Sequence, residues 1–181
     1  AYTSNDFNRS FAYLNKAFKW GYFTEVKDYK NFNSILNKKG KNSILWVARF
    51  IKVKHPEVVI ELAKRLKNEK YNFEINMIGI GELLEDTKIL AKKYNVENNI
   101  NFLGSMSPEQ VRKHMEQNEL FLFTSDRGEG WGAVLNEAMN SGCAVVASHA
   151  IGSVPFLIHN NVNGLIYKDG DIDDLFNKVK Y

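Results

Sequence analysis

The chain has 181 residues, of which 44% are hydrophobic, and its 24 Lys and Arg against 21 Asp and Glu give a net charge of +3. This length is enough for one domain with a sizeable core, and the charge is too small to predict a nucleic-acid surface. No apolar stretch approaches the roughly 18 residues of a membrane span, no residues show metal-ligand spacing, and the single cysteine excludes an intrachain disulfide. The composition therefore predicts a soluble globular protein that does not bind nucleic acid.

The first 42 residues lack the regular alternation that follows, and they are predicted to be a linker with a leading helical segment. Four apolar side chains recur there at helical spacing: Phe7, Phe11, Leu14 and Phe18. Gly21 is expected to end that helix, whose apolar face needs a partner, either the flank of this domain or a preceding domain. Residues 33–42 are predicted to be a surface connector. The first residue is Ala1 rather than Met, which predicts that the chain is part of a longer protein.

From residue 43 onward, short apolar runs alternate with stretches of helical periodicity. Strands are predicted at residues 44–48, 73–78, 100–103, 120–123, 144–147 and 164–167. Helices are predicted at residues 56–66, 83–94, 108–115, 133–141 and 154–158, and from residue 171 onward. Six strands separated by helices indicate an α/β fold with a doubly wound, parallel, Rossmann-like sheet. The ligand site of such a sheet lies at the carboxyl ends of the strands, where the strand order reverses.

Two cations follow the first predicted strand, Arg49 and Lys54. A loop at that position can bring positive charge to a diphosphate leaving group. Lys52 is an alternative to Lys54 for this role. His55 precedes a proline and is predicted to be a loop residue without a role in the site.

The second predicted strand ends in Gly79-Ile80-Gly81. This stretch fails the G-x-G-x-x-G dinucleotide fingerprint, because Leu84 stands where the third glycine would be. A nicotinamide-dependent dehydrogenase is therefore disfavoured. Gly81 is predicted to form a tight turn at the nucleotide edge of the site.

The most informative stretch runs from Glu129 to Glu137, with seven residues between the two carboxylates. It is predicted to form a glycine turn that leads from a buried strand into a helix. A helix entered through glycines presents backbone N–H groups and the positive end of its dipole to an anion. The side chain of Glu137, about one and a half turns into the helix, is expected to point back to the mouth where Glu129 lies. Two acids beside an anion site are suited to bind the hydroxyls of sugars on either side of a diphosphate.

This stretch resembles the E-x7-E motif of the retaining nucleotide-sugar glycosyltransferases of family 4, also called group 1, whose two-domain architecture is GT-B. The resemblance covers about residues 43–180. It implies that residues 43–181 form the C-terminal, donor-binding domain and that residues 1–42 lead to it from a first domain. The segment 19–23 resembles the link between those two domains.

The resemblance also implies roles for individual residues. Arg49, Lys54 and Glu129 would carry the reaction, the two cations by stabilising the leaving diphosphate and Glu129 by holding the donor sugar. The remaining residues implied to bind the nucleotide sugar are Glu137 at the ribose, the backbone of Gly130, Trp131, Gly132, Ala133 and Val134 near the phosphates, Ser125 near the diphosphate, Phe102 and Leu103 at the base, and Gly81. Trp131 replaces the phenylalanine that is commoner in the family, and Phe156 stands where the family often has glutamate.

The expected reaction is transfer of a hexose-type sugar from a UDP-sugar, preferred over GDP-mannose, with retention, in polysaccharide or glycoconjugate synthesis. No cofactor or metal is predicted, since the phosphate loops contain no Asp-x-Asp pair. The expected partners are an N-terminal acceptor-binding domain of the same protein and a glycan or lipid-linked acceptor. The expected location is cytoplasmic, with the inner face of the membrane as an alternative reached through the missing domain. Two other functions stay open: a GT-B nucleotide-sugar epimerase and a nucleotide-binding module without turnover.

Overall fold

The computed structural model describes residues 3–14, 16–18 and 20–180, which include a six-stranded sheet. The strands are β1 (Gly40–Val47), β2 (Glu74–Ile78), β3 (Ile100–Gly104), β4 (Asn118–Phe123), β5 (Ala144–Ser148) and β6 (Leu165–Tyr167). Their order is β3-β2-β1-β4-β5-β6, and every neighbouring pair is parallel. The predicted doubly wound parallel sheet is confirmed. The strand order reverses between β1 and β4, which places the ligand site expected for this topology at the carboxyl ends of those two strands.

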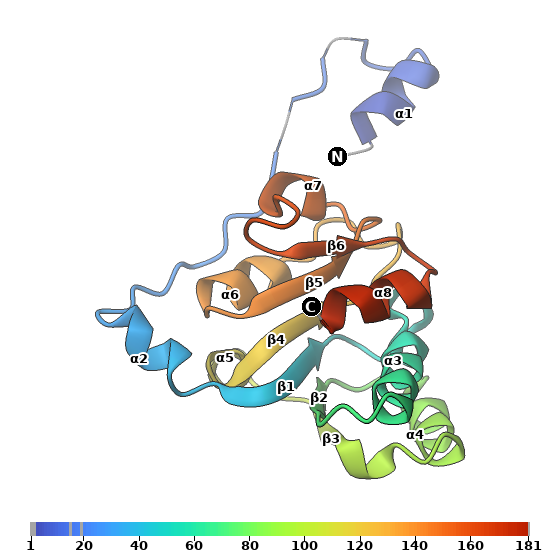
Figure 1. The fold of residues 1–181 in the computed structure, drawn as a ribbon. Coiled ribbons are helices and arrows are strands. Elements are labelled where there is room, and N and C mark those ends of the chain that lie inside the picture. The colour runs from blue at the N-terminus through green and yellow to red at the C-terminus, as the bar shows by residue number, and fades with distance from the viewer. Residues whose placement is uncertain (1–2, 15, 19, 181) are drawn as a thin grey trace.

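Helices cover both faces of the sheet (Figure 1). They are α3 (Pro56–Asn68), α4 (Leu84–Lys93) and α8 (Ile172–Val179) on one face, and α5 (Pro108–Gln117) and α6 (Val134–Asn140) on the other, with the short α7 (Val154–Leu157) near the carboxyl end of β5. All six predicted helices from residue 56 onward are present, with their ends within a few residues of the predicted bounds.

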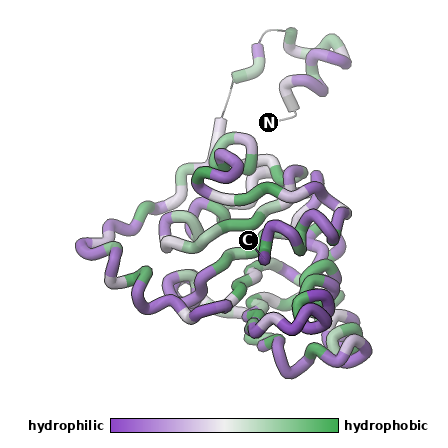
Figure 2. The backbone as a smooth tube through the Cα atoms, in the orientation of Figure 1, coloured by the Kyte–Doolittle hydropathy of each residue, from purple (hydrophilic) through white to green (hydrophobic). Residues whose placement is uncertain are grey.

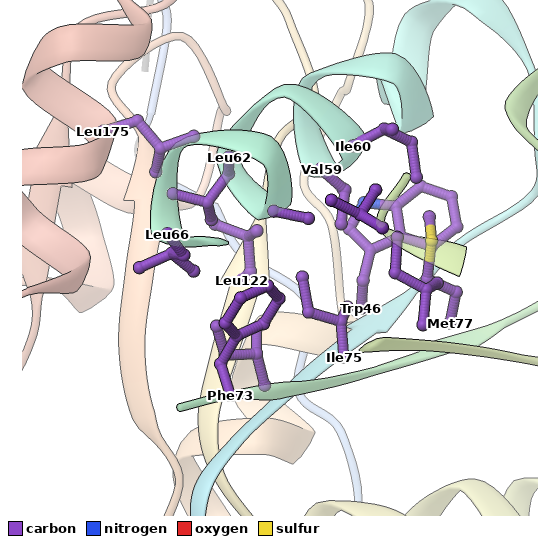
Figure 3. Packing of buried hydrophobic residues seen from close by; sticks show 14 of the residues in the cluster. Trp46, Val59, Ile60, Leu62, Leu66, Phe73, Ile75, Met77, Leu122 and Leu175 are labelled. Carbon is purple, nitrogen blue, oxygen red and sulfur yellow. The ribbon is translucent and has the colours of Figure 1, made fainter. Parts of the chain in front are cut away.

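Alternate residues of each strand face opposite sides, so the core has two halves. Ile44 and Trp46 pack with α3, α4 and α8 in the first half, whereas Leu45 packs with α5 and α6 in the second. Figure 3 shows Trp46 beneath the residues of α3 that face the sheet. Figure 2 shows that hydrophobic residues concentrate in the central strands. The sheet is thus buried on both sides, which explains why its strands appear in the sequence as continuous apolar runs.

The predicted leading helix is much shorter than its pattern suggested. Helix α1 (Thr3–Arg9) ends before Phe11, and both Phe11 and Tyr13 have φ of 55°. A left-handed residue ends a right-handed helix, so the spacing of the later apolar residues does not describe one helical face. Phe11 is 82% and Phe18 89% exposed, and α1 lies away from the sheet in Figure 1. The apolar side chains of the predicted leading helix therefore do not pack together on the flank of this domain.

Residues 33–42 were predicted to be a connector, and this is wrong. They contain most of helix α2 (Phe32–Leu36) and the first residues of β1. The side chain of Asn31 accepts a hydrogen bond from the Ser34 backbone and begins the helix. Phe32 lies close to Gly142, so tertiary packing stabilises a helix of only five residues in a stretch rich in Lys and Asn. Among the described residues, none of the helices has the length and apolar character needed to cross a membrane.

Candidate functional site

A pocket of about 490 Å³ lies at the carboxyl end of β1, between the loop that follows β1 and the loop that leads into α6. It is lined by Tyr22, Val47, Ala48, Arg49, Lys54, Glu129, Gly130, Trp131, Gly132, Ala133 and Val134. The structure therefore brings together the three residues predicted to carry the reaction and the five predicted to meet the phosphates. The position matches the switch point of the sheet. Lys54 lines the pocket and Lys52 does not, which favours Lys54 of the two candidate lysines.

Lys54 and Glu129 form an ion pair within this pocket. The side chains are only 17% and 13% exposed, and Ser125 donates a hydrogen bond to the same carboxylate oxygen, Oε2, at 3.1 Å. Partial burial strengthens the attraction between opposite charges because less water screens it. The pocket thus neutralises part of its own charge, and an anion that binds here competes with Glu129 for Lys54.

Glycines allow the loop before α6 to lie tightly against its neighbours. Gly132 has φ of 76°, and a Cβ added there would lie 2.5 Å from the ring of Phe123. A Cβ added to Gly152, in the loop after β5, would lie 1.7 Å from the carbonyl oxygen of Gly130. The loop after β5 therefore packs directly against the backbone of Gly130. This contact fixes the position of the amides that line the pocket.

Trp131 is held by contacts on several sides. Its ring stacks on that of Phe156 with centroids 5.6 Å apart, and its Nε1 donates a hydrogen bond to Asn136 at 3.0 Å. Tyr22 of the leading segment contacts the same ring system, with centroids 6.3 Å apart. Phe156, which stands where the resembled family often has glutamate, thus contributes an aromatic support to the loop.

His55 connects the two loops of the pocket, a role that the sequence did not predict. Its Nδ1 lies 2.7 Å from Glu57 Oε1, and its Nε2 lies 3.0 Å from Asp126 Oδ2. Asp126 also accepts a hydrogen bond from the backbone of Gly128 at 2.7 Å. A histidine between two carboxylates donates from both nitrogens only when it is protonated. Asp126 lies 71 positions further along the chain, so no local spacing could have revealed the contact.

The pKa values of this cluster shift in the directions expected for a charged histidine. Partial burial lowers the pKa of His55, but the hydrogen bonds to Glu57 and Asp126 outweigh it, and the net pKa is raised. Burial raises the pKa of Asp126, but hydrogen bonds from Gly128 and His55 outweigh it, and the net pKa is lowered. The contribution of His55 to stability is therefore fully present below about pH 6.5 and is lost as the pH rises through its folded pKa. That of Asp126 is present above about pH 4 and is lost as the pH falls.

We expect His55→Gln to lower the free energy of unfolding by on the order of 0.5–1 kcal/mol near pH 5.5, and by clearly less near pH 9, because the pair is partly exposed and screened. Urea denaturation of both proteins at the two pH values measures the difference. In an Asp126→Asn background the pH-dependent part should shrink. An effect of His55→Gln that is equal at both pH values would contradict a charged histidine between two carboxylates.

Five of the predicted nucleotide-binding residues do not line this pocket: Ser125, which reaches it only through its hydrogen bond to Glu129, and Glu137, Phe102, Leu103 and Gly81. Glu137 is in the first turn of α6, because the helix begins at Val134, and it lines a separate groove. Glu129 and Glu137 thus line different hollows, and a contact of Glu137 with the ligand at Glu129 stays a prediction. The other residues of that groove are Glu25, Lys27, Pro108, Glu109, Arg112 and Lys113.

Phe102 and Leu103, at the end of β3, are partly buried and pack against opposite halves of the core. Gly81 lies in a tight turn, where an added Cβ would lie 2.4 Å from the carbonyl oxygen of Phe50. Core packing and the tight turn explain the positions of all three residues. A contact between any of them and a nucleotide stays a prediction. In the part of the chain that the structure describes, no group of three or more His, Cys, Asp and Glu side chains could hold a metal ion.

Comparison with known proteins gives matches over most of the chain. Residues 27–181 match the family described as "Glycosyl transferases group 1". The chain is 32% identical to the amylovoran biosynthesis glycosyltransferase AmsK of Erwinia amylovora over 137 residues, which cover 73% of this chain and 33% of that protein. It is 30% identical to the protein CapJ of Staphylococcus aureus over 131 residues, 72% of this chain and 33% of that protein. The chain thus spans about a third of the length of these relatives.

Solved structures share the fold. A TarM variant of S. aureus, in complex with fondaparinux, alpha-GlcNAc-glycerol and UDP, has a TM-score of 0.79 at 22% identity, over 92% of this chain and 33% of that one. HepE of Anabaena, in complex with UDP, has a TM-score of 0.69 at 22% identity, over 82% and 40%. The C-terminal domain of the group 1 family protein LpcC of Francisella tularensis has a TM-score of 0.71 at 23% identity, over 86% of this chain and 83% of that one.

Proposed function

The chain belongs to the group 1 glycosyl transferases, and on that premise we propose that it is the donor-binding domain of a retaining glycosyltransferase. The proposed enzyme transfers a hexose-type sugar from a UDP-sugar to a glycan or lipid-linked acceptor in polysaccharide or glycoconjugate synthesis. The acceptor is bound by an N-terminal domain of the same protein, and the whole protein works in the cytoplasm. Relatives named for polysaccharide synthesis and neighbours solved with UDP support this proposal. The family membership supports a transferase over an epimerase or a module without turnover.

The observation that carries the proposal is the distribution of charge in the pocket at the carboxyl end of β1. Arg49 and Lys54 line this pocket together with the loop that runs from Gly130 to Val134. Cations and the backbone of a loop that leads into a helix N-terminus, lining one pocket, suit the diphosphate of a nucleotide sugar. Glu129, held at the same place by Lys54 and Ser125, suits the sugar hydroxyls.

The groove at Glu137 provides room for the nucleoside. Val134 lines the pocket and Glu137, three residues further along α6, lines the groove. Three helical residues rise by about 4.5 Å, so a ribose attached to the bound diphosphate can lie between the two hollows. We therefore keep Glu137 as the ribose ligand of this proposal, with Arg112, which donates to the Glu137 carbonyl oxygen at 3.4 Å, in the same groove.

We expect the chain to bind UDP without a divalent metal, because Arg49 and Lys54 balance the diphosphate charge and the phosphate loops hold no Asp-x-Asp pair. Calorimetry with UDP, GDP and ADP, each in EDTA and in Mg²⁺, measures this. UDP should bind most tightly and with the same dissociation constant in both buffers. Binding of UDP that is lost in EDTA would contradict the metal-free site, and binding of none of the three nucleotides would contradict the proposed function.

The two glutamates should have separable effects. Glu137→Ala should weaken UDP and UDP-sugar alike, by about 1–3 kcal/mol for a lost hydrogen bond to a charged group. Glu129→Ala should leave UDP affinity undiminished, since removing this carboxylate releases Lys54 for the diphosphate, and should weaken the discrimination among UDP-sugars. Glu85→Ala, on the exposed surface of α4, serves as the control in the same calorimetric series. Equal losses of UDP affinity in the two variants would show that Glu129 is not at the sugar.

A further inference from the structure

The leading segment reaches the donor pocket through Tyr22. We infer that Tyr22 is a specificity-determining wall of that pocket, which selects neutral hexopyranosyl donors over donors with a sugar carboxylate. This inference rests on the proposed function and goes beyond it, because it names the sugar class and assigns a role to a segment that the sequence indicated only as a linker.

The segment that carries Tyr22 is fixed to the domain from Lys27 onward. The backbone N–H of Lys27 donates to Asn140 Oδ1 at 2.9 Å, and Asn140 Nδ2 donates back to the carbonyl oxygen of Lys27 at 3.2 Å. The side chains of Lys27 and Tyr29 both donate to Glu116 Oε1, at 2.6 and 2.8 Å. These contacts join the segment to the last turns of α5 and α6 from Lys27 onward, so the stretch that carries Tyr22 runs between this anchored part and the pocket.

The backbone at Gly21 lies directly against Trp131. A Cβ added to Gly21 would lie 2.6 Å from the far edge of the indole ring. Because the backbone comes this close, the ring of Tyr22 contacts Trp131, which in turn stacks on Phe156. Tyr22 remains 64% exposed, so much of its surface is open to a ligand. The neighbouring Phe23 contacts Trp20 instead and is 86% exposed.

The pocket therefore has two different sides. Arg49 and Lys54 form the cationic side, which suits the diphosphate, whereas Tyr22 and Trp131 form the aromatic side next to Glu129. The C–H face of a pyranose can pack on an aromatic ring while its hydroxyls meet the carboxylate. A sugar carboxylate would instead meet the negative ring faces and the charge of Glu129, both of which repel it. Glucose-type donors should bind here, and glucuronate-type donors should be rejected.

Calorimetry of the 181-residue chain with UDP, UDP-glucose and UDP-glucuronate tests the inference. The unmodified chain should bind UDP-glucose more tightly than UDP-glucuronate. Tyr22→Ala should weaken UDP-glucose by about fivefold, the value of one aromatic contact, and leave UDP unchanged. Tyr22→Phe should keep the preference for UDP-glucose, because the aromatic ring provides the contact.

Two further variants test the place of the segment. Gly21→Val should act like Tyr22→Ala, because the larger side chain pushes the segment off Trp131. Phe23→Ala is the matched control, and it should leave the affinities for UDP, UDP-glucose and UDP-glucuronate unchanged.

Two outcomes would overturn the inference while the proposed function stands. One is binding of UDP with no preference between the two UDP-sugars. The other is a preference that Tyr22→Ala leaves intact, or a loss in this variant that is equal for UDP and UDP-glucose. Failure of the unmodified chain to bind UDP at all would overturn the proposed function, and this inference with it.

Discussion

In the proposed two-domain enzyme, Lys54→Ala and Arg49→Ala are each expected to lower kcat by about 100-fold or more, with a much smaller change in donor affinity. Both side chains line the pocket beside the loop of Gly130 to Val134. Negative charge on the diphosphate grows as the bond to the sugar breaks. A cation at this place therefore stabilises the transition state more than the bound donor, and its loss appears in kcat.

The ion pair of Lys54 with Glu129 should make the effect of Lys54→Ala on donor affinity smaller still. Lys54 is paired with Glu129, so a donor that takes over Lys54 must first separate this pair. Steady-state kinetics of UDP release with an acceptor, together with calorimetry of UDP, separate the two effects. Lys52→Ala is the matched control, because Lys52 lies in the same loop outside the pocket and its loss should leave the rate unchanged. A variant at Lys54 with a raised KM and an unchanged kcat would show that this cation acts in binding alone.

The sheet could be predicted from the sequence because each strand is an apolar run buried by helices on both faces. The first residues of α3 and α5 could also be predicted, since Pro56 and Pro108 occupy the first turn of these helices. Helix α2 could not be predicted from the sequence. It has five residues, and its place depends on packing against Gly142, which lies more than 100 positions away.

The same distinction holds for the site. Arg49, Lys54 and Glu129 follow the ends of predicted strands, so the topology alone brought them to one edge of the sheet. The ion pair between Lys54 and Glu129 and the contacts of His55 with Asp126 depend on how loops fold between those strands. Local sequence patterns cannot predict such pairs, because the paired residues lie more than 70 positions apart. Tyr22 is the clearest case, because its place against Trp131 depends on Gly21 and on anchors further along the segment.

The second large effect concerns turnover itself: the 181-residue chain should bind UDP yet show no acceptor-dependent release of UDP. The chain spans about a third of the length of the relatives named above, and the pocket proposed for the donor is built from loops at one edge of a single sheet. We propose that the acceptor-binding domain forms the opposite wall. Such a wall orients the attacking hydroxyl and excludes water, and orientation alone can supply about 7 kcal/mol or more of the barrier.

A comparison of two proteins measures this effect, the chain alone and the same chain preceded by the proposed acceptor-binding domain. UDP release from UDP-sugar is followed with and without a panel of glycan acceptors. The longer protein should turn over with an acceptor, and the chain alone should not, although both bind UDP with similar affinity because Arg49, Lys54 and Glu137 belong to this chain. Equal UDP affinity is the control that separates a missing wall from a misfolded pocket. Acceptor-dependent release by the chain alone, at a rate of about 1 s⁻¹ or more, would contradict the proposed second wall, because it would show that one domain both orients the acceptor and excludes water.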